Sequence, residues 1–137
     1  MTRYPSKQKA IDHALWNSFN HRFQGQSYGV VLSSKGDYLV LPTDHVSFEK
    51  SDFEIIPKHY CDMDYKHIKQ IAMDDDPLNH WEEILGMFSV LHGEILRFIL
   101  EAKIPLEKFI RWELASRGYD KNHQWCGFEK AKEIWLK

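Results

Sequence analysis

The apolar pattern between Asp76 and Lys103 constrains the fold of this chain more than any other feature of its sequence. Large apolar residues recur there at helical spacing: Trp81, Ile84, Leu85, Phe88, Leu91, Ile95, Phe98 and Ile99. Asp76 is a suitable N-cap, and Pro77 suits the first helical position. Such a helix would be roughly 40 Å long, whereas a compact domain of this size has a radius of gyration of about 14 Å. We therefore expect one helix that spans the domain, or a helix that breaks near Gly93.

The apolar side of this helix is also the predicted core. With 137 residues, the chain can bury roughly two-thirds of its unfolded surface without a disulfide or a metal. We therefore expect a single domain, residues 1–137. This core should contain Ile84, Leu85, Phe88, Leu91, Ile95 and Phe98. They are expected to contact Ile11, Leu15 or Phe19 of a first helix.

Shorter patterns predict the remaining elements. Residues 6–24 show helical spacing, and Ser6 is a suitable N-cap. Two β-rich runs in residues 27–42 surround a glycine-containing turn and indicate a hairpin, and one or two short strands are expected between residues 46 and 56. Further helices are expected at 62–73, 106–117 and 128–136. This order predicts an α+β fold with a small antiparallel, hairpin-based sheet and about five helices, one of them long.

Charge is nearly balanced overall but unevenly distributed. The formal net charge of −2 gives no general attraction to nucleic acid. Residues 44–83 contain eleven acidic and four basic side chains, whereas residues 103–137 contain five acidic and eight basic ones. This distribution indicates solvated faces, or a charge-complementary contact within or between chains.

Cysteine usage and hydropathy predict a cytoplasmic protein. Cys61 and Cys126 belong to no CxxC motif, which indicates free thiols in a reducing compartment. The sequence begins without the apolar run of a signal peptide. It contains no stretch of eighteen apolar residues, so no membrane span is expected.

Histidine and glutamate residues in the predicted long helix are candidates for acid–base chemistry. His80 and Glu83 are three residues apart, and His92 and Glu94 follow. A di-iron bundle needs repeated Glu-x-x-His pairs, but the order here is reversed, and no His-Glu-x-x-His zinc motif is present. We expect neither a metal nor a cofactor, and the four residues remain weak candidates for a small enzyme.

Two glycines within the same stretch indicate close packing. Gly86 and Gly93 are seven residues apart, so they would lie on nearly one face of a helix, and each would cost roughly 1 kcal/mol relative to alanine. A strip of small residues lets another backbone approach. Three alternatives remain open: packing within the chain, a helix–helix contact across a homodimer, or the floor of a small-ligand cleft.

The C-terminal segment combines basic and aromatic residues. Arg111, Arg117 and Lys121 alternate with Trp112, Tyr119 and Trp125. Such a mixture could stack on bases and contact phosphates. However, acidic residues dilute the basic residues of the last predicted helix, so nucleic-acid binding is expected to be weak and non-specific.

Two runs in this tail resemble a known group of proteins. They are Phe109-Ile-Arg-Trp-Glu-Leu-Ala-Ser-Arg-Gly-Tyr-Asp and Trp125-Cys-Gly-Phe-Glu-Lys-Ala-Lys-Glu-Ile-Trp-Leu. They are similar to the C-termini of small uncharacterised bacterial proteins of mobile, integron-type gene cassettes. The resemblance covers about the last 30 residues and includes no catalytic motif. It implies a bacterial, cytosolic, often oligomeric protein and assigns no role to any residue.

These observations favour a small homodimeric module that binds a small molecule or a partner protein. Candidate ligand or interface residues are Trp81, Gly86, Gly93, Trp112, Tyr119 and Trp125. One alternative is a small enzyme that uses the histidines and glutamates of the long helix. Another is a nucleic-acid-binding regulator that uses the basic, aromatic tail.

Overall fold

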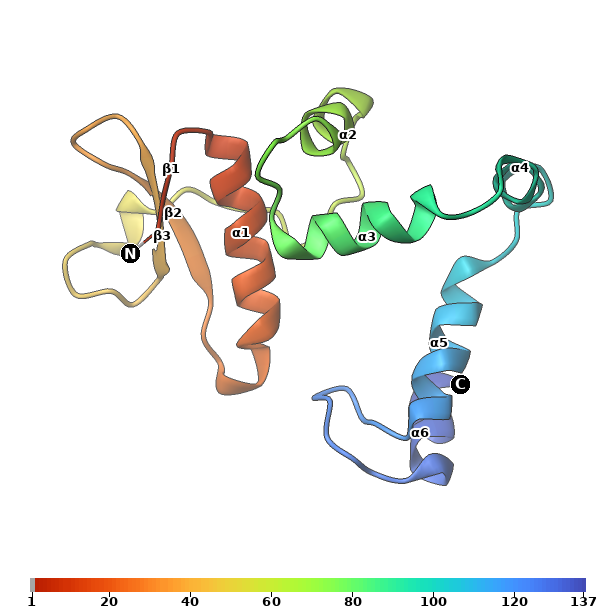
Figure 1. Ribbon diagram of the computed structural model, residues 1–137. Coiled ribbons are helices and arrows are strands. Elements are labelled where there is room, and N and C mark those ends of the chain that lie inside the picture. Colours follow the sequence, from red (N-terminus) through yellow and green to blue (C-terminus); the bar gives the residue numbers. More distant parts are fainter. Residues whose placement is uncertain (1) are drawn as a thin grey trace. The chain divides into compact units, whose positions relative to one another are not determined.

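The computed structural model describes residues 2–137 and confirms the α+β class (Figure 1). The chain divides into two compact units, one up to Met87 and the other from Phe88 to Lys137. Each unit is described by itself below, and the single domain expected from chain length stays a prediction.

The first unit contains a three-stranded antiparallel sheet with the order β1-β3-β2. Its strands are β1 (Arg3–Tyr4), β2 (Tyr28–Leu32) and β3 (Tyr38–Pro42). The predicted hairpin pairs β2 with β3, with Val30 opposite Val40. Gly36 allows the turn because its φ of 88° lies in the left-handed region. No strand forms at residues 46–48, and residues 53–56 contribute only an isolated bridge between Glu54 and Val30.

Helix α1 (Lys7–Asn20) packs on this sheet and forms the core with it. Ser6 caps the helix, as expected, by accepting a hydrogen bond from the Lys9 backbone at 3.4 Å. The residues that pack inward are small: Ala10 and Ala14 are fully buried beside Val30, which is also fully buried. Of the larger α1 residues expected in the core, Ile11 packs against this cluster, whereas Phe19 is more than half exposed. After α1 come a short 3-10 helix, η1 (Arg22–Gln24), and Gly25 in the left-handed region.

Two further helices complete the first unit. A 3-10 turn, η2 (Lys50–Asp52), precedes α2 (Tyr65–Ala72), whose N-cap Asp64 accepts from the His67 backbone at 2.9 Å. Helix α3 (Asn79–Ser89) follows after Pro77, and the boundary between the two units falls near its end.

The predicted long helix is broken, as the second of the two alternatives had it. Helix α3 ends at Ser89, and α4 (Gly93–Glu101) begins at Gly93. His92 is the N-cap, with an extended backbone at φ −63° and ψ 138°. Glycine is a poor helix former, and the break falls directly before Gly93. The apolar periodicity of the sequence therefore continues across a point where the helical hydrogen bonds are interrupted.

Most residues of the predicted core are not buried within their own unit. Phe88, Leu91, Ile95 and Phe98 are exposed, with Phe98 57% exposed, and Leu85 is only half-buried. The buried apolar residues of the first unit lie instead where α1 meets the sheet. Helical periodicity identified an apolar face correctly, but it contains no information about which surface covers that face.

Gly86 and Gly93 do not mark a close contact within the described chain. A Cβ atom added at either position would have no neighbouring atom within 4 Å among residues 2–137. Neither glycine therefore makes a close contact within its own unit, and the three alternatives for the glycine strip stay predictions.

The second unit pairs α5 (Leu106–Arg117) with α6 (Phe128–Trp135). Ala115 and Ala131 are buried in it. Gly118 ends α5 in the left-handed region, with the Trp125 ring against its Cα, and Trp135 donates its indole hydrogen to the Tyr119 carbonyl at 2.8 Å. Of the helices in the described part of the chain, none combines the length and apolar character needed to cross a membrane.

Candidate functional site

A buried carboxylate on α1 is the centre of the candidate site. Asp12 is 3% exposed. It lies two residues, or about 200° around the helix, from both Ala10 and Ala14, so it points away from the sheet. Charged side chains are almost never fully buried unless they are paired. Asp12 therefore needs partners from elements that pack on the outer side of α1.

Helix α2 supplies the main partner. His67 Nε2 lies 3.1 Å from Asp12 Oδ2, and both side chains are largely buried. Gln8, one turn earlier on α1, donates to Asp12 Oδ1 at 3.3 Å. The Asp64 side chain caps α2 by accepting a hydrogen bond from the backbone N–H of His67. This bond fixes the backbone position from which the His67 imidazole projects. The carboxylate thereby fixes the orientation of an imidazole, an arrangement suited to hydrogen bonding or proton transfer.

Two aromatic residues next to this pair have buried polar atoms without hydrogen bonds of full geometry, although the Tyr60 hydroxyl lies close to both Asp12 and Trp81. The rings of Tyr60 and Trp81 meet edge to face at 5.2 Å. Neither the Tyr60 hydroxyl nor the Trp81 indole nitrogen has a hydrogen-bond partner of full geometry among the described residues. Burial strongly raises the pKa of Tyr60, and the neighbouring Asp12 carboxylate raises it further. Buried polar groups without partners are rare and often contact water or a ligand.

His80 is the other buried polar residue of the unit, at 8% exposed. Its ring stacks on Trp16 with the centroids 4.8 Å apart, and its Nε2 atom also lacks a partner within residues 2–137. Burial lowers the pKa of His80, and the nearby His13 lowers it too, whereas the charge of Asp12 opposes this effect. At neutral pH the His80 ring is therefore neutral.

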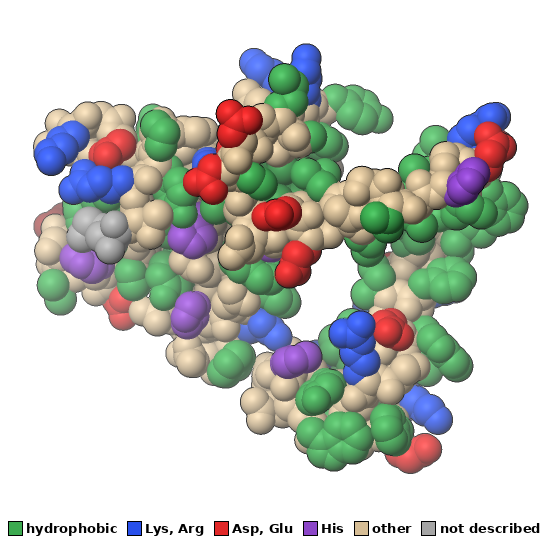
Figure 2. Space-filling model, viewed as in Figure 1, with side chains coloured by type: hydrophobic (Ala, Val, Ile, Leu, Met, Phe, Trp, Pro, Cys, Tyr) green, Lys and Arg blue, Asp and Glu red, His purple; other side chains and the backbone are tan. Residues whose placement is uncertain are grey.

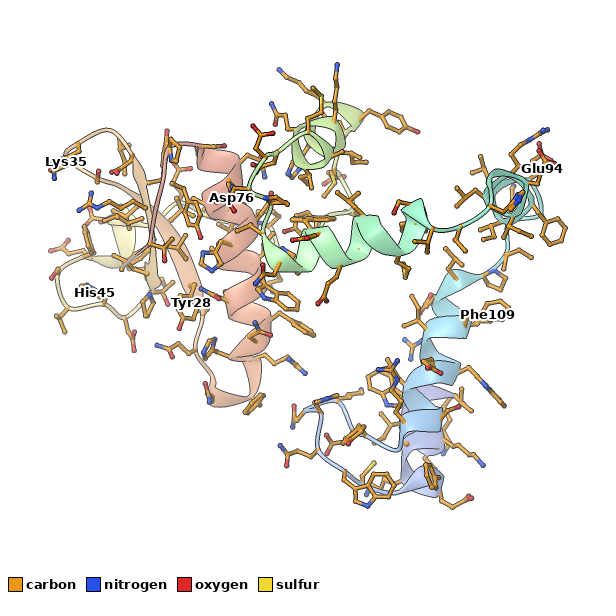
Figure 3. The ribbon with its side chains drawn as sticks, viewed as in Figure 1. Tyr28, Lys35, His45, Asp76, Glu94 and Phe109 are labelled. Atoms are coloured by element: carbon orange, nitrogen blue, oxygen red, sulfur yellow. The ribbon has the colours of Figure 1, made fainter. Side chains whose placement is uncertain are left out.

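Two surface hollows flank these residues, beside the segment containing Asp76 that is labelled in Figure 3. The Asp12 hollow has a volume of about 210 Å³, and its lining includes Lys9, Asp12, His67 and Trp81. The His80 hollow has a volume of about 630 Å³. Its lining includes Tyr4, His13, Trp16 and His80.

One ion pair and one carboxylate–imidazole hydrogen bond border the Asp12 hollow. Lys9 Nζ lies 2.9 Å from Asp74 Oδ2 and also donates to the Asp76 carbonyl. Asp12 is paired with His67. The indole N–H of Trp81, whose neighbour is the Tyr60 hydroxyl, has no hydrogen bond of full geometry near this hollow. The hollow is therefore suited to a small polar molecule.

The residues predicted from sequence are distributed over both units. Trp81 and His80 each line a hollow, while Glu83 and Gly86 are exposed on α3. In the second unit, Glu94 pairs with Arg97 at 3.5 Å, and His92 makes no side-chain cap.

The other predicted aromatic residues, Trp112, Tyr119 and Trp125, lie in the second unit. Trp112 is exposed, Tyr119 stacks on His123 at 4.7 Å, and Trp125 is exposed on its outer side. The four acid–base candidates are divided between the units, with His80 and Glu83 in the first and His92 and Glu94 in the second. Among residues 2–137, no group of three His, Cys, Asp or Glu residues is suited to holding a metal ion.

Sequence reasoning missed Asp12 and Tyr60 and gave His67 little weight. A carboxylate beside Ile11 in an amphipathic helix is a weak signal, since most such residues are solvated. The partner that makes Asp12 significant is 55 residues away, and nothing in the local pattern connects the two.

Buried His80 and half-buried His13 predict a loss of stability in acid. Burial lowers the pKa of both His13 and His80 below about 6.5. The unfolded chain therefore binds more protons than the folded one as pH falls below this value, so stability present at pH 7.5 decreases toward pH 5.5. Urea unfolding at several pH values measures this. His80→Phe, which retains the stack on Trp16, is expected to flatten the decrease. A stability that is constant or rises toward pH 5.5 would contradict the prediction.

Comparison with known proteins gives no further assignment. No family model matches the chain, and neither a curated protein nor a solved structure matches it.

Proposed function

We propose that this protein is a binding module whose first unit takes a small, polar, uncharged molecule in the Asp12 hollow. The observation that carries the proposal is the Trp81 indole nitrogen, which is buried, has no hydrogen bond of full geometry, and lies beside Tyr60 and the paired Asp12 and His67. A ligand oxygen that accepted from this N–H would remove the cost of leaving it unsatisfied. Leu78 and Ile71 would contact the apolar part of the ligand.

The size of the hollow limits the ligand. About 210 Å³ is below the roughly 300–1,000 Å³ of typical drug-sized sites. We therefore propose a molecule with few non-hydrogen atoms, such as a small amide or alcohol, and not a nucleotide or a peptide.

A fragment screen by thermal shift, followed by calorimetric titration of each hit, tests the proposal. Trp81→Phe retains a ring and removes the N–H, so it is expected to weaken binding about tenfold, the equivalent of about 1.4 kcal/mol. Trp112→Phe, on an exposed side chain of the second unit, is the matched control and should leave affinity unchanged. Absence of any stabilising uncharged fragment, or equal binding by the Trp81→Phe variant, would contradict the proposal.

A second candidate function is a small enzyme that uses His67. It is supported by the Asp12–His67 pair at 3.1 Å on the edge of a hollow, since a carboxylate that orients an imidazole is a common acid–base device. In this candidate the acid–base residue is His67, and not one of the four residues expected from the sequence, which are His80, Glu83, His92 and Glu94. If the same fragments are converted as well as bound, and His67→Gln binds them without conversion, the enzyme becomes the better proposal.

The nucleic-acid alternative receives less support from the tail. Arg111 pairs with Glu107 at 3.1 Å, and Arg117 pairs with Glu113 at 3.3 Å. Pairs of this kind leave little net positive charge along α5, and phosphate contacts dominate non-specific affinity. Weak, non-specific binding therefore remains the expectation.

A further inference from the structure

The His80 hollow lies within the first unit and has the size of a small-molecule site. Its volume of about 630 Å³ falls inside the roughly 300–1,000 Å³ that such sites occupy. Rings and apolar side chains form much of its lining: Tyr4, Pro5, Trp16, Pro77 and Leu78. In Figure 2, histidine side chains lie among hydrophobic ones on the first unit. Aromatic walls with a few polar groups are typical of a site for a small organic molecule.

One nitrogen of this lining is buried without a hydrogen bond. His80 is 8% exposed, and its Nε2 atom meets no donor or acceptor among residues 2–137. The stack on Trp16, with the centroids 4.8 Å apart, holds the plane of the ring. Buried polar atoms without partners are rare and often contact water or a ligand. The hollow that His80 lines is the place for such a partner.

A second imidazole of the lining has a defined donor atom. The Tyr4 hydroxyl is hydrogen-bonded to His13 Nδ1. Burial, together with the charge of Asp76, raises the pKa of Tyr4, while burial lowers the pKa of His13. The tyrosine therefore retains its proton and donates to Nδ1, which leaves the imidazole hydrogen on Nε2. His13 thus contributes an N–H donor to the lining of the hollow.

The remaining polar side chains favour an uncharged ligand. Asn17 and Asn79 line the hollow, and an amide places a donor beside an acceptor, the pair that fits the N6 and N7 atoms of adenine. The two cationic residues of the lining, Arg3 and Lys9, each pair with an aspartate, at 3.2 and 2.9 Å. Because both cations are already paired, the hollow is poorly suited to a phosphate group.

We propose that the His80 hollow binds an uncharged adenine ring, as the free base or as its nucleoside. Trp16 is 37% exposed and would stack on the ring. An asparagine amide would pair with the N6 and N7 edge, and His13 would donate to a ring nitrogen. The site is separate from the Asp12 hollow, and the proposal does not depend on the ligand of that hollow.

Calorimetric titration of the full chain with adenine, adenosine and adenosine monophosphate, each to about 5 mM, tests the proposal. Adenine or adenosine is expected to bind, and the monophosphate to bind about tenfold more weakly than adenosine. Purine, which lacks the N6 amino group, is the matched control ligand and is expected to bind more weakly than adenine. Absence of binding by both adenine and adenosine would overturn the proposal, as would a monophosphate that binds as tightly as adenosine.

Trp16→Leu removes the stacking ring and is expected to weaken adenine binding about tenfold. Trp112→Leu, which removes an exposed indole from the second unit, is the matched control and should bind as the wild type does. A Trp16→Leu variant that binds with unchanged affinity would contradict the proposed site.

Nuclear magnetic resonance of the wild type covers variants that fail to fold. Adenine is expected to shift the imidazole signals of His13 and His80 and the indole signal of Trp16. Shifts confined to His67 and Trp81 would assign the base to the Asp12 hollow and overturn the proposal, and shifts confined to the second unit would overturn it as well.

Discussion

Replacing Asp12 with alanine is expected to lower the free energy of unfolding by about 3–5 kcal/mol, as for other buried pairs that lose one partner. The change leaves His67 Nε2 and the Gln8 amide without their acceptor, in a position that is 3% exposed. It also opens a void under α2. Urea unfolding followed by circular dichroism measures the loss.

Two comparisons separate the pair from the packing around it. Asp12→Asn retains a side-chain oxygen and nearly the same volume, so it is expected to cost less than half as much. A double-mutant cycle with His67→Ala should give a coupling energy of about 1–3 kcal/mol. A loss below about 1 kcal/mol for Asp12→Ala would show that the carboxylate is solvated and not the centre of a buried cluster.

Replacing Gly118 with alanine is expected to cost about 2–5 kcal/mol, because two effects add. The φ of 75° is unfavourable for residues with a Cβ atom, at roughly 1–2 kcal/mol. The new methyl group would also lie 2.5 Å from Cζ3 of the Trp125 ring, and overpacking of this kind typically costs about 1–3 kcal/mol.

Gly25 provides the matched control for this prediction. Its φ of 70° is similar, but a Cβ atom there would have no neighbour within 4 Å in the described chain. Gly25→Ala should therefore cost only the backbone part, about 1–2 kcal/mol. Thermal unfolding of both variants measures the difference. If the two lose the same amount, the contact between Gly118 and Trp125 has no energetic importance.

Local chemistry made several elements predictable. The Ser6 cap, the β2–β3 hairpin and the end of α5 at Gly118 occur where the sequence placed them. Each depends on atoms within a few residues: a hydroxyl that accepts from the first turn, a glycine with positive φ, or alternation along a strand. The α+β class followed from these local signals together.

For the interrupted helix, the local sequence predicted an apolar helical segment but could not decide between one helix and two. Apolar spacing continues from Trp81 to Ile99, while Gly93 disfavours the helical state. Both alternatives agreed with the sequence. The structure resolves them in favour of two helices, because His92 adopts an extended backbone and starts a new one.

The sequence by itself determined most of the helical segments, the β2–β3 hairpin and which side of α3 and α4 is apolar, but it predicted strands between residues 46 and 56 that do not form and gave no signal for β1. Only the tertiary structure decided that the core forms between α1 and the sheet, and that Phe98 is exposed. It alone brought His67 to Asp12. Caps, turns and periodicity act over a few residues along the chain, whereas burial and pairing depend on surfaces that meet through space and leave no pattern in the local sequence.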